Sequence, residues 1–152
     1  MGREEPDVPV DHRLCLALYQ ASHAMDSLYR VLLDGHGLTY TQYTVLSLLA
    51  QDGPASVTSL ARRLSLSSNT LSPLLKRMEQ QGRVTRRRSA QDERTVLVDL
   101  APEGRLLADE LGDVQRDVTA ATGLGADEQD DLVDVLGRLA GSLRKAADEG
   151  QR

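Results

Sequence analysis

Apolar residues recur every three or four positions along several stretches of the chain, a spacing that places them on one face of a helix. The first stretch, residues 11–33, predicts a long helix that ends at Gly35 and Gly37. Its apolar stripe consists of Leu14, Leu18, Ala21, Met25, Leu28 and Leu32. Thr39 with Gln42 three residues later forms a capping box, which predicts that a second helix begins there.

Two shorter helices follow the turn at residues 52–54. Ser56 caps the first, over residues 57–64, and Ser67 or Ser68 opens the second, which ends at Gly82. Two short helices joined in this way form a helix-turn-helix, in which the second helix presents its first residues outward.

The period then changes from helical to two. Residues 83–89 and 94–100 are typical of strands, with Val96 and Val98 alternating with polar or outward positions, and residues 90–93 join them. A hairpin directly after a helix-turn-helix is a wing. Two further helices are predicted at residues 102–121 and 127–147, the last with a stripe at Leu132, Leu136, Leu139 and Leu143.

The predicted fold class is therefore mainly α (α+β), a winged helix-turn-helix with additional N- and C-terminal dimerisation helices. We expect one domain over residues 11–147, with a DNA-binding lobe at 39–100, dimerisation helices at 11–36 and 102–147, and flexible tails at 1–10 and 148–152. The terminal helices carry more apolar surface than one domain needs to bury, which favours a two-fold homodimer that reads an inverted repeat in double-stranded DNA.

Charge is distributed unevenly along the 152 residues, whose net charge is −5. Residues 62–94 hold nine basic and three acidic side chains, giving +6, whereas residues 1–61 and 95–152 carry −4 and −7. A charged run is often only a solvated face. Here the basic block coincides with the helix-turn-helix and its wing, which indicates contact with nucleic acid.

Short polar side chains open the second helix of the motif, where they can reach base edges or phosphates. The candidate contacts of this recognition helix are Ser67, Ser68, Asn69, Thr70, Ser72, Lys76 and Arg77. We expect Ser67 or Ser68 to cap, Thr70 to contact DNA, and the two cations to hold phosphates. The candidates on the wing are Arg86, Arg87, Arg88, Asp92 and Arg94, with Arg94 as the minor-groove finger and Asp92 as its ion-pair partner.

One cysteine and no disulfide framework are typical of a reducing cytosol. The start of the chain has neither the basic region nor the apolar core of a signal peptide, and no apolar run approaches the roughly 20 residues that span a bilayer. We therefore expect a cytoplasmic protein without membrane contact, metal or cofactor. His12 and Cys15 are three residues apart, but no third ligand follows at a useful spacing for zinc.

Cys15 lies near the start of the first helix, where amide groups and the helix dipole favour the thiolate, the reactive form of cysteine. A buried cysteine otherwise packs as a small hydrophobe, and from the pattern alone both interpretations stay open.

The order of elements resembles the MarR family of bacterial transcriptional regulators over nearly the whole chain. The resemblance depends on Leu38-Thr39-Tyr40-Thr41-Gln42-Tyr43, on residues 71–82 (LSPLLKRMEQQG) and on the wing residues Asp92-Glu93-Arg94. Within that family the sequence is most similar to the organic hydroperoxide resistance regulators (OhrR) of the one-cysteine class, through residues 14–19 (LCLALY), Tyr29, Tyr40 and the proline-containing run 70–79.

This resemblance implies that Cys15 is a peroxide-sensing thiol to which Tyr29 and Tyr40 of the partner subunit donate hydrogen bonds, with Tyr19 as a third candidate. An organic hydroperoxide would be the signal, oxidation would release the repressor from its operator, and a small-molecule thiol would cap the oxidised sulfur. The chain departs from the family pattern at Ala101, where a Thr or Ser cap is usual, and in lacking Phe and Trp.

Two alternatives remain at this stage. One is a MarR-type repressor released by a phenolic or other small ligand, with Cys15 as packing. The other is a thiol peroxidase, which the absence of a resolving cysteine and the presence of a basic wing both disfavour. We therefore expect a regulator and not an enzyme.

Overall fold

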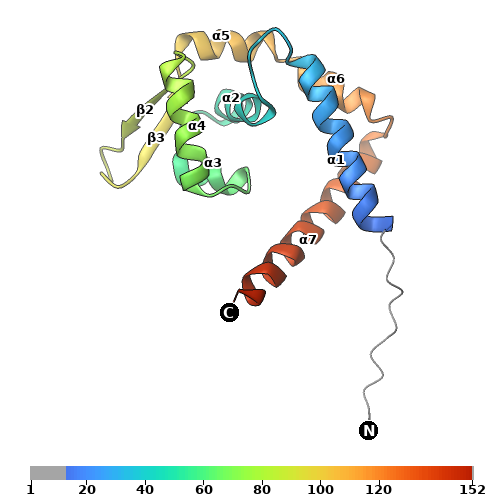
Figure 1. Ribbon diagram of the computed structural model, residues 1–152. Helices are drawn as coiled ribbons and strands as arrows, with labels where there is room; N and C mark the ends of the chain where they lie inside the picture. Colours follow the sequence, from blue (N-terminus) through green and yellow to red (C-terminus); the bar gives the residue numbers. More distant parts are fainter. Residues whose placement is uncertain (1–12, 152) are drawn as a thin grey trace. The chain divides into compact units, whose positions relative to one another are not determined.

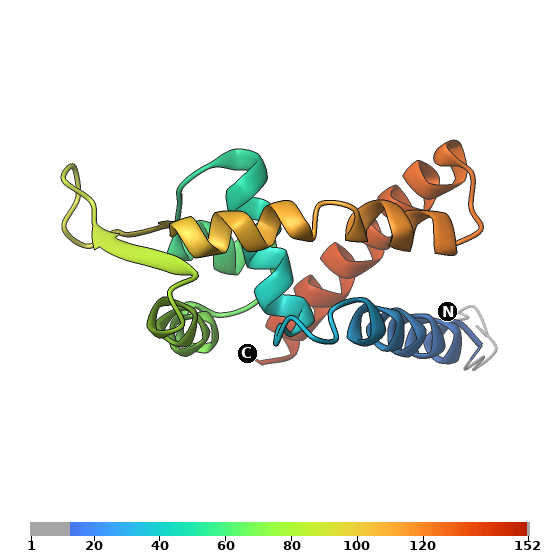
Figure 2. The ribbon, with the colours of Figure 1, turned by 90° about the horizontal axis from the view of Figure 1, so that it is seen from above.

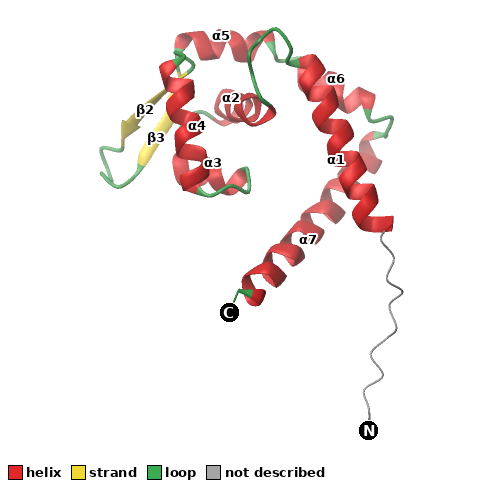
Figure 3. Ribbon diagram, in the orientation of Figure 1, coloured by secondary structure: helices red, strands yellow, loops and turns green. Residues whose placement is uncertain are grey.

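The computed structural model describes residues 13–151. Its elements, in chain order, are α1 (Arg13–Leu32), α2 (Tyr40–Asp52), β1 (Ala55–Ser56), α3 (Val57–Arg63), α4 (Ser68–Gln80), β2 (Val84–Arg88), β3 (Val96–Leu100), α5 (Pro102–Glu110), α6 (Val114–Ala121) and α7 (Ala126–Gly150) (Figure 1). Helices predominate over one small sheet, which confirms the predicted class (Figure 3). The chain divides after Gly112 into two compact units, which are described separately.

The core of the first unit gathers the inner faces of α2, α3 and α4 against the sheet. Side chains that are almost completely excluded from solvent are Val45, Leu46, Leu49, Leu60, Leu71, Leu75, Met78, Val84 and Val98. The sheet is antiparallel in the order β1-β3-β2, with Arg86 opposite Val98. Figure 2 shows the β2–β3 hairpin projecting beyond the helices of this unit. The core therefore fixes both parts of the winged helix-turn-helix.

Local capping signals in the sequence are confirmed where they were expected. Thr39 and Gln42 bond reciprocally, with Gln42 N to Thr39 Oγ1 at 3.3 Å and Thr39 N to Gln42 Oε1 at 3.1 Å. Ser56 caps α3 and Ser67 caps α4, each accepting a backbone N–H three residues on at 3.1 Å. Pro102 begins α5 behind Ala101, which makes no side-chain cap.

Other expectations need correction. The helix predicted over residues 102–121 is two helices, because the chain breaks at residues 111–113, where Gly112 supports a helix poorly. The strands are shorter than predicted, and the last helix extends to Gly150. Strand β1 was not predicted, since its two residues are defined only by pairing with Leu97 and Val98 of β3.

The terminal helices bury little of their apolar stripes. Tyr29 is the one buried residue of α1, Leu33 follows it, and Leu14 and Val31 are 59% and 73% exposed. In the second unit no residue of α7 is buried. No helix within residues 13–151 has the length and apolarity that a membrane crossing requires.

Gly104 allows the first turn of α5 to approach the start of β2. A Cβ atom at this position would overlap the carbonyl oxygen of Arg83, which is backbone and cannot turn aside. The same carbonyl accepts a hydrogen bond from Ala101 N at 3.0 Å. The absence of a side chain at position 104 is therefore a packing requirement.

We expect Gly104→Ala to lower the free energy of unfolding by about 1–3 kcal/mol, because the added methyl must push α5 away from β2. Chemical denaturation measures this. Gly141→Ala is the matched control: it lies mid-helix opposite the leucine stripe of α7, a Cβ there meets nothing within 4 Å, and it should stabilise by about 0.5–1 kcal/mol. Equal stability of Gly104→Ala and the parent would contradict the packing requirement.

Candidate DNA interface and sensor site

Helix α4 has one buried and one exposed side. Leu71, Leu75 and Met78 are fully buried, whereas Ser68, Asn69 and Thr70 are exposed in its first turn, and Lys76 and Arg77 are exposed farther along. Ser72 is half-buried. The sequence-predicted contacts therefore lie mostly on the outward side of one helix, as a major-groove reader requires.

Thr70 has a role besides the predicted contact. Its hydroxyl lies 2.8 Å from the Ser67 hydroxyl, and its N–H donates to that same Ser67 oxygen. The two side chains thus fix each other at the exposed end of α4. Ser67 is the cap of α4. Ser68 and Asn69 follow it in the first turn of the helix, and both are exposed.

Arg86 was predicted to contact DNA, but its side chain is engaged inside the lobe. Its Nη2 and Nε donate to Glu79 Oε1 at 3.1 and 3.3 Å, and its N–H donates to Glu79 Oε2 at 3.0 Å. These hydrogen bonds hold the pKa of Glu79 below its usual range, with desolvation opposing them. The ionised pair joins α4 to β2, so Arg86 is a structural residue of the wing.

Glu79 was missed as a site residue because nothing in its local sequence marks it. It is an ordinary acidic position near the end of an amphipathic helix, seven residues before Arg86. Only the turn at Gly82, whose φ is +73°, brings the strand back beside the helix and creates the contact.

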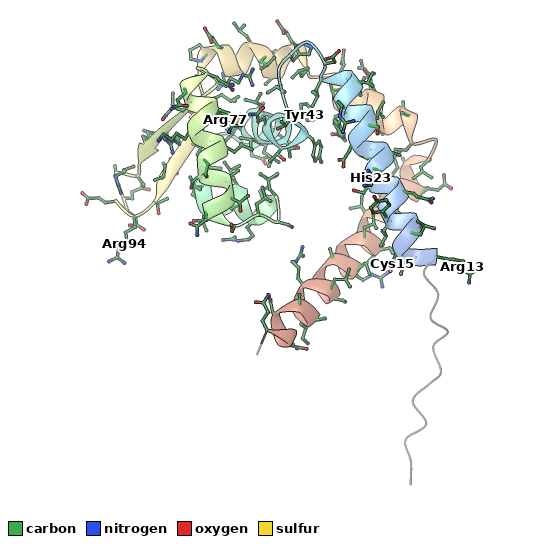
Figure 4. The ribbon with its side chains drawn as sticks, in the orientation of Figure 1. Arg13, Cys15, His23, Tyr43, Arg77 and Arg94 are labelled. Atoms are coloured by element: carbon green, nitrogen blue, oxygen red, sulfur yellow. The ribbon has the colours of Figure 1, made fainter. Side chains whose placement is uncertain are left out.

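The tip of the wing is organised by Asp92, though not by the predicted ion pair. Asp92 Oδ1 accepts the N–H of Arg94 at 3.0 Å, and Oδ2 accepts the Thr95 hydroxyl at 3.2 Å. Among the described residues its carboxylate forms no ion pair with the Arg94 guanidinium. The Arg94 side chain instead extends away from the lobe at the tip (Figure 4).

Arg87 and Arg88, the other two arginines of β2, differ in the contacts of their side chains. Arg88 donates through Nη1 to the carbonyl oxygen of Glu93 at 2.8 Å, which braces the loop between the strands. Arg87 is exposed on β2, opposite Leu97. Arg87, Arg88 and Arg94 thus all present positive charge at the exposed surface of the wing, whereas the charge of Arg86 is paired with Glu79.

Cys15 is exposed in the first described turn of α1. Tyr19, one turn later, is 62% exposed and its ring lies 4.3 Å from that of His23. Figure 4 shows Cys15 and His23 on the same helix. His12, which the sequence places three residues before Cys15, lies outside the described residues. Among residues 13–151 no three His, Cys, Asp or Glu side chains are grouped to hold a metal.

Tyr29 and Tyr40 meet at the other end of α1. Their ring centroids are 4.5 Å apart, and they line a cavity of about 290 Å³ between α1 and the start of α2 with Asp26, Arg30, Leu33, Leu38 and Thr39. Burial, followed by the neighbouring Tyr40 and Tyr43, raises the pKa of Tyr29 to about 12. The hydroxyl of Tyr29 is therefore protonated at neutral pH.

The tyrosine cavity and Cys15 of one chain are far apart. Fourteen residues of α-helix separate Cys15 from Tyr29, which at 1.5 Å per residue is about 21 Å. The structure thus brings Tyr29 and Tyr40 together, but does not bring either to Cys15 within one chain.

Together these features identify the fold as a winged helix-turn-helix with a polar recognition helix, a basic wing and helical extensions at both ends. The MarR family model matches residues 38–96, from the start of α2 through the wing. The chain belongs to the MarR family of DNA-binding transcriptional regulators.

Two curated relatives and one solved structure illustrate the similarity. The regulator TtmR of Methylorubrum extorquens (strain PA1) is 41% identical over 146 residues, covering 96% of this chain and 74% of that protein. The organic hydroperoxide resistance transcriptional regulator of Bacillus subtilis (strain 168) is 44% identical over 105 residues, covering 69% and 71%. The structure of reduced AbfR bound to DNA is 32% identical with a TM-score of 0.72, covering 87% and 92%.

We expect Arg94→Ala to weaken binding to a specific duplex about tenfold or more, in line with ~1–3 kcal/mol for a readout contact. Its thermal unfolding should barely change, since among residues 13–151 the Arg94 side chain makes no hydrogen bond or ion pair. Fluorescence anisotropy at fixed salt measures the affinity, with exposed Arg105→Ala on α5 as control. Equal affinity of Arg94→Ala and the parent would refute the assignment of the wing tip.

The same substitution at two neighbouring arginines of β2 should lower stability at one position and leave it nearly unchanged at the other. Arg86→Gln should lower the free energy of unfolding by about 1 kcal/mol, because it removes charge-assisted bonds to a partly exposed Glu79. Arg87→Gln should leave it within about 0.5 kcal/mol and reduce the salt dependence of DNA binding. Urea denaturation separates the two, and a larger stability loss for Arg87→Gln would contradict the Glu79–Arg86 bridge.

Proposed function

We propose that this regulator is a homodimeric repressor that senses organic hydroperoxides through oxidation of Cys15, which releases it from an inverted-repeat operator. The observation that carries the proposal is the pairing of an exposed thiol at one end of α1 with a tyrosine cavity at its other end. The two are about 21 Å apart along one helix, so only a second copy can bring a thiol to the cavity.

Exposed apolar side chains on the terminal helices support a dimer. In α1 they include Leu14 and Leu16, and in α7 they are Leu132, Val133, Val135, Leu136 and Leu143. An interface between copies would bury these exposed apolar side chains, and a two-fold axis would give each Cys15 the same surroundings. The winged lobes of the pair would then face two half-sites, about 34–36 Å apart when separated by one helical turn.

The chemistry at Cys15 is a two-electron oxidation. The thiolate sulfur attacks one peroxide oxygen, the S–O bond forms as the O–O bond breaks, and the organic part leaves as an alcohol after taking a proton. The resulting sulfenic acid condenses with a small-molecule thiol to give a mixed disulfide and water. Tyr29, protonated at neutral pH, is suited to donate a hydrogen bond to the anionic sulfur of the partner, with Tyr40 beside it.

Leu33 and Leu38 form the apolar part of the cavity, which favours an alkyl chain over hydrogen peroxide as the signal. An added oxygen or mixed disulfide at an interface helix introduces bulk and polarity where apolar side chains pack. In this proposal the change shifts the two DNA-reading lobes relative to each other, so the half-site spacing no longer matches.

The decisive experiment uses a duplex selected from a random library for binding to the reduced protein. Cumene hydroperoxide should release the parent from this duplex, whereas Cys15→Ser, which keeps the size but cannot form a sulfenic acid, should stay bound. Tyr29→Phe should be oxidised about tenfold or more slowly, because it loses a hydrogen bond to a charged group worth ~1.5–3 kcal/mol.

The other outcomes point to the alternatives. Release of both the parent and Cys15→Ser would favour a ligand-responsive regulator and sink the thiol mechanism. Repeated turnover of peroxide would favour the peroxidase. Mass spectrometry of Cys15 in the same samples shows whether oxidation and release occur together.

A further inference from the structure

Residue 83 is the point where the recognition helix, the wing and α5 meet. The Arg83 N–H donates to the carbonyl oxygen of Met78 in α4 at 2.9 Å, and its own carbonyl oxygen accepts Ala101 N at 3.0 Å. Gly104 packs directly against that carbonyl, and Val84 begins β2. A displacement of the Arg83 backbone would therefore move both the end of α4 and the start of β2.

The Arg83 side chain reaches in the opposite direction, to the loop that connects α1 with α2. Its Nη2 donates to the carbonyl oxygen of His36 at 3.2 Å, and its Nη1 donates to that of Gly37 at 3.3 Å. These contacts join residues 46 and 47 positions apart in sequence. A guanidinium presents several N–H groups in one plane and can hold two successive carbonyl oxygens, which an aliphatic side chain cannot.

The loop presents these carbonyls because of its glycines. Gly35 and Gly37 have φ values of +83° and +63°, which turn the chain after α1 and leave the peptide oxygens of His36 and Gly37 facing Arg83. In the same loop, His36 Nδ1 lies 4.0 Å from Glu110 Oε2 of α5.

Helix α1 is buried against the rest of the first unit near its C-terminal end. Tyr29 and Leu33 are 5% and 2% exposed, whereas the preceding two-thirds of the helix, Cys15 included, is largely exposed. Within the first unit, a shift of α1 therefore acts first on its last turn and on the loop beyond it, to which Arg83 binds.

We propose that Arg83 is the positioning residue that couples α1 to the recognition helix and wing. Through its two carbonyl contacts, a change in the position of the α1–α2 loop is carried to the junction between α4 and β2. The proposal rests on the proposed function only for the nature of the signal, oxidation at Cys15; the coupling itself belongs to the single chain.

The first test compares release of the selected duplex in the parent, Arg83→Gln and Arg83→Lys proteins, with Arg105→Gln as the matched control. The affinity of each reduced protein for the duplex is the reference from which its own loss on oxidation is measured. Oxidation by cumene hydroperoxide should weaken binding of the parent and control by about 5–150-fold, the usual range for coupled sites, and of Arg83→Gln by less than about threefold. Arg83→Lys, with one donor group, should fall between them.

Mass spectrometry must show equal oxidation of Cys15 in all four proteins, because a merely structural defect would not separate oxidation from release. Equal release of parent and Arg83→Gln at equal oxidation would overturn the role of Arg83 while leaving the proposed function intact. Failure of the parent to release DNA after oxidation would overturn the proposed function, and the second measurement then decides the coupling.

That second measurement is hydrogen exchange of the loop amides, residues 34–39, in reduced protein with and without the duplex. Coupling is reciprocal, so DNA should slow their exchange in the parent and in Arg105→Gln but not in Arg83→Gln. Equal slowing in the parent and in Arg83→Gln, or no slowing in the parent, would show that the loop does not sense the DNA-reading lobe through Arg83.

Discussion

Leu71, Leu75 and Met78 lie fully buried along one side of α4, and their burial decides which way the polar side chains of that helix face. Each buried side chain of this kind contributes about 1.5–3 kcal/mol, whereas an exposed ion pair contributes about 0–1 kcal/mol. The rotation of the helix about its axis is therefore set by the core it shares with α2, α3 and the sheet. The Ser67 cap and the Glu79–Arg86 bridge refine that placement.

Features that depend on neighbours in sequence were predictable. The Thr39–Gln42 capping box and a serine cap at Ser67 or Ser68 each need residues within a few positions, so the sequence predicts them, and the structure assigns the second cap to Ser67. The wing was recognisable from its period of two, and the family resemblance, which the comparisons confirm, followed from motifs within this same lobe.

Features that depend on distant partners were not predictable. The ion pair of Arg86 with Glu79 exists only because the chain turns back at Gly82, and β1 exists only by pairing with β3. The sequence correctly placed Asp92 near Arg94. It did not reveal that the Asp92 carboxylate accepts the backbone N–H of Arg94 and does not pair with the Arg94 guanidinium. The break in the helix predicted over 102–121 depends on a single weak position, Gly112, that periodicity alone passes over.

The Glu79–Arg86 bridge and the Asp92 turn give the lobe a fixed form before it meets a duplex. A pre-organised reader loses little conformational entropy on docking, so its affinity is not reduced by the cost of ordering the wing. Because the lobe is rigid, small internal changes within it do little to reduce its affinity for DNA. Control of such a reader is therefore most effective when it moves α4 and the wing together, because a small change in their common orientation misaligns every contact at once.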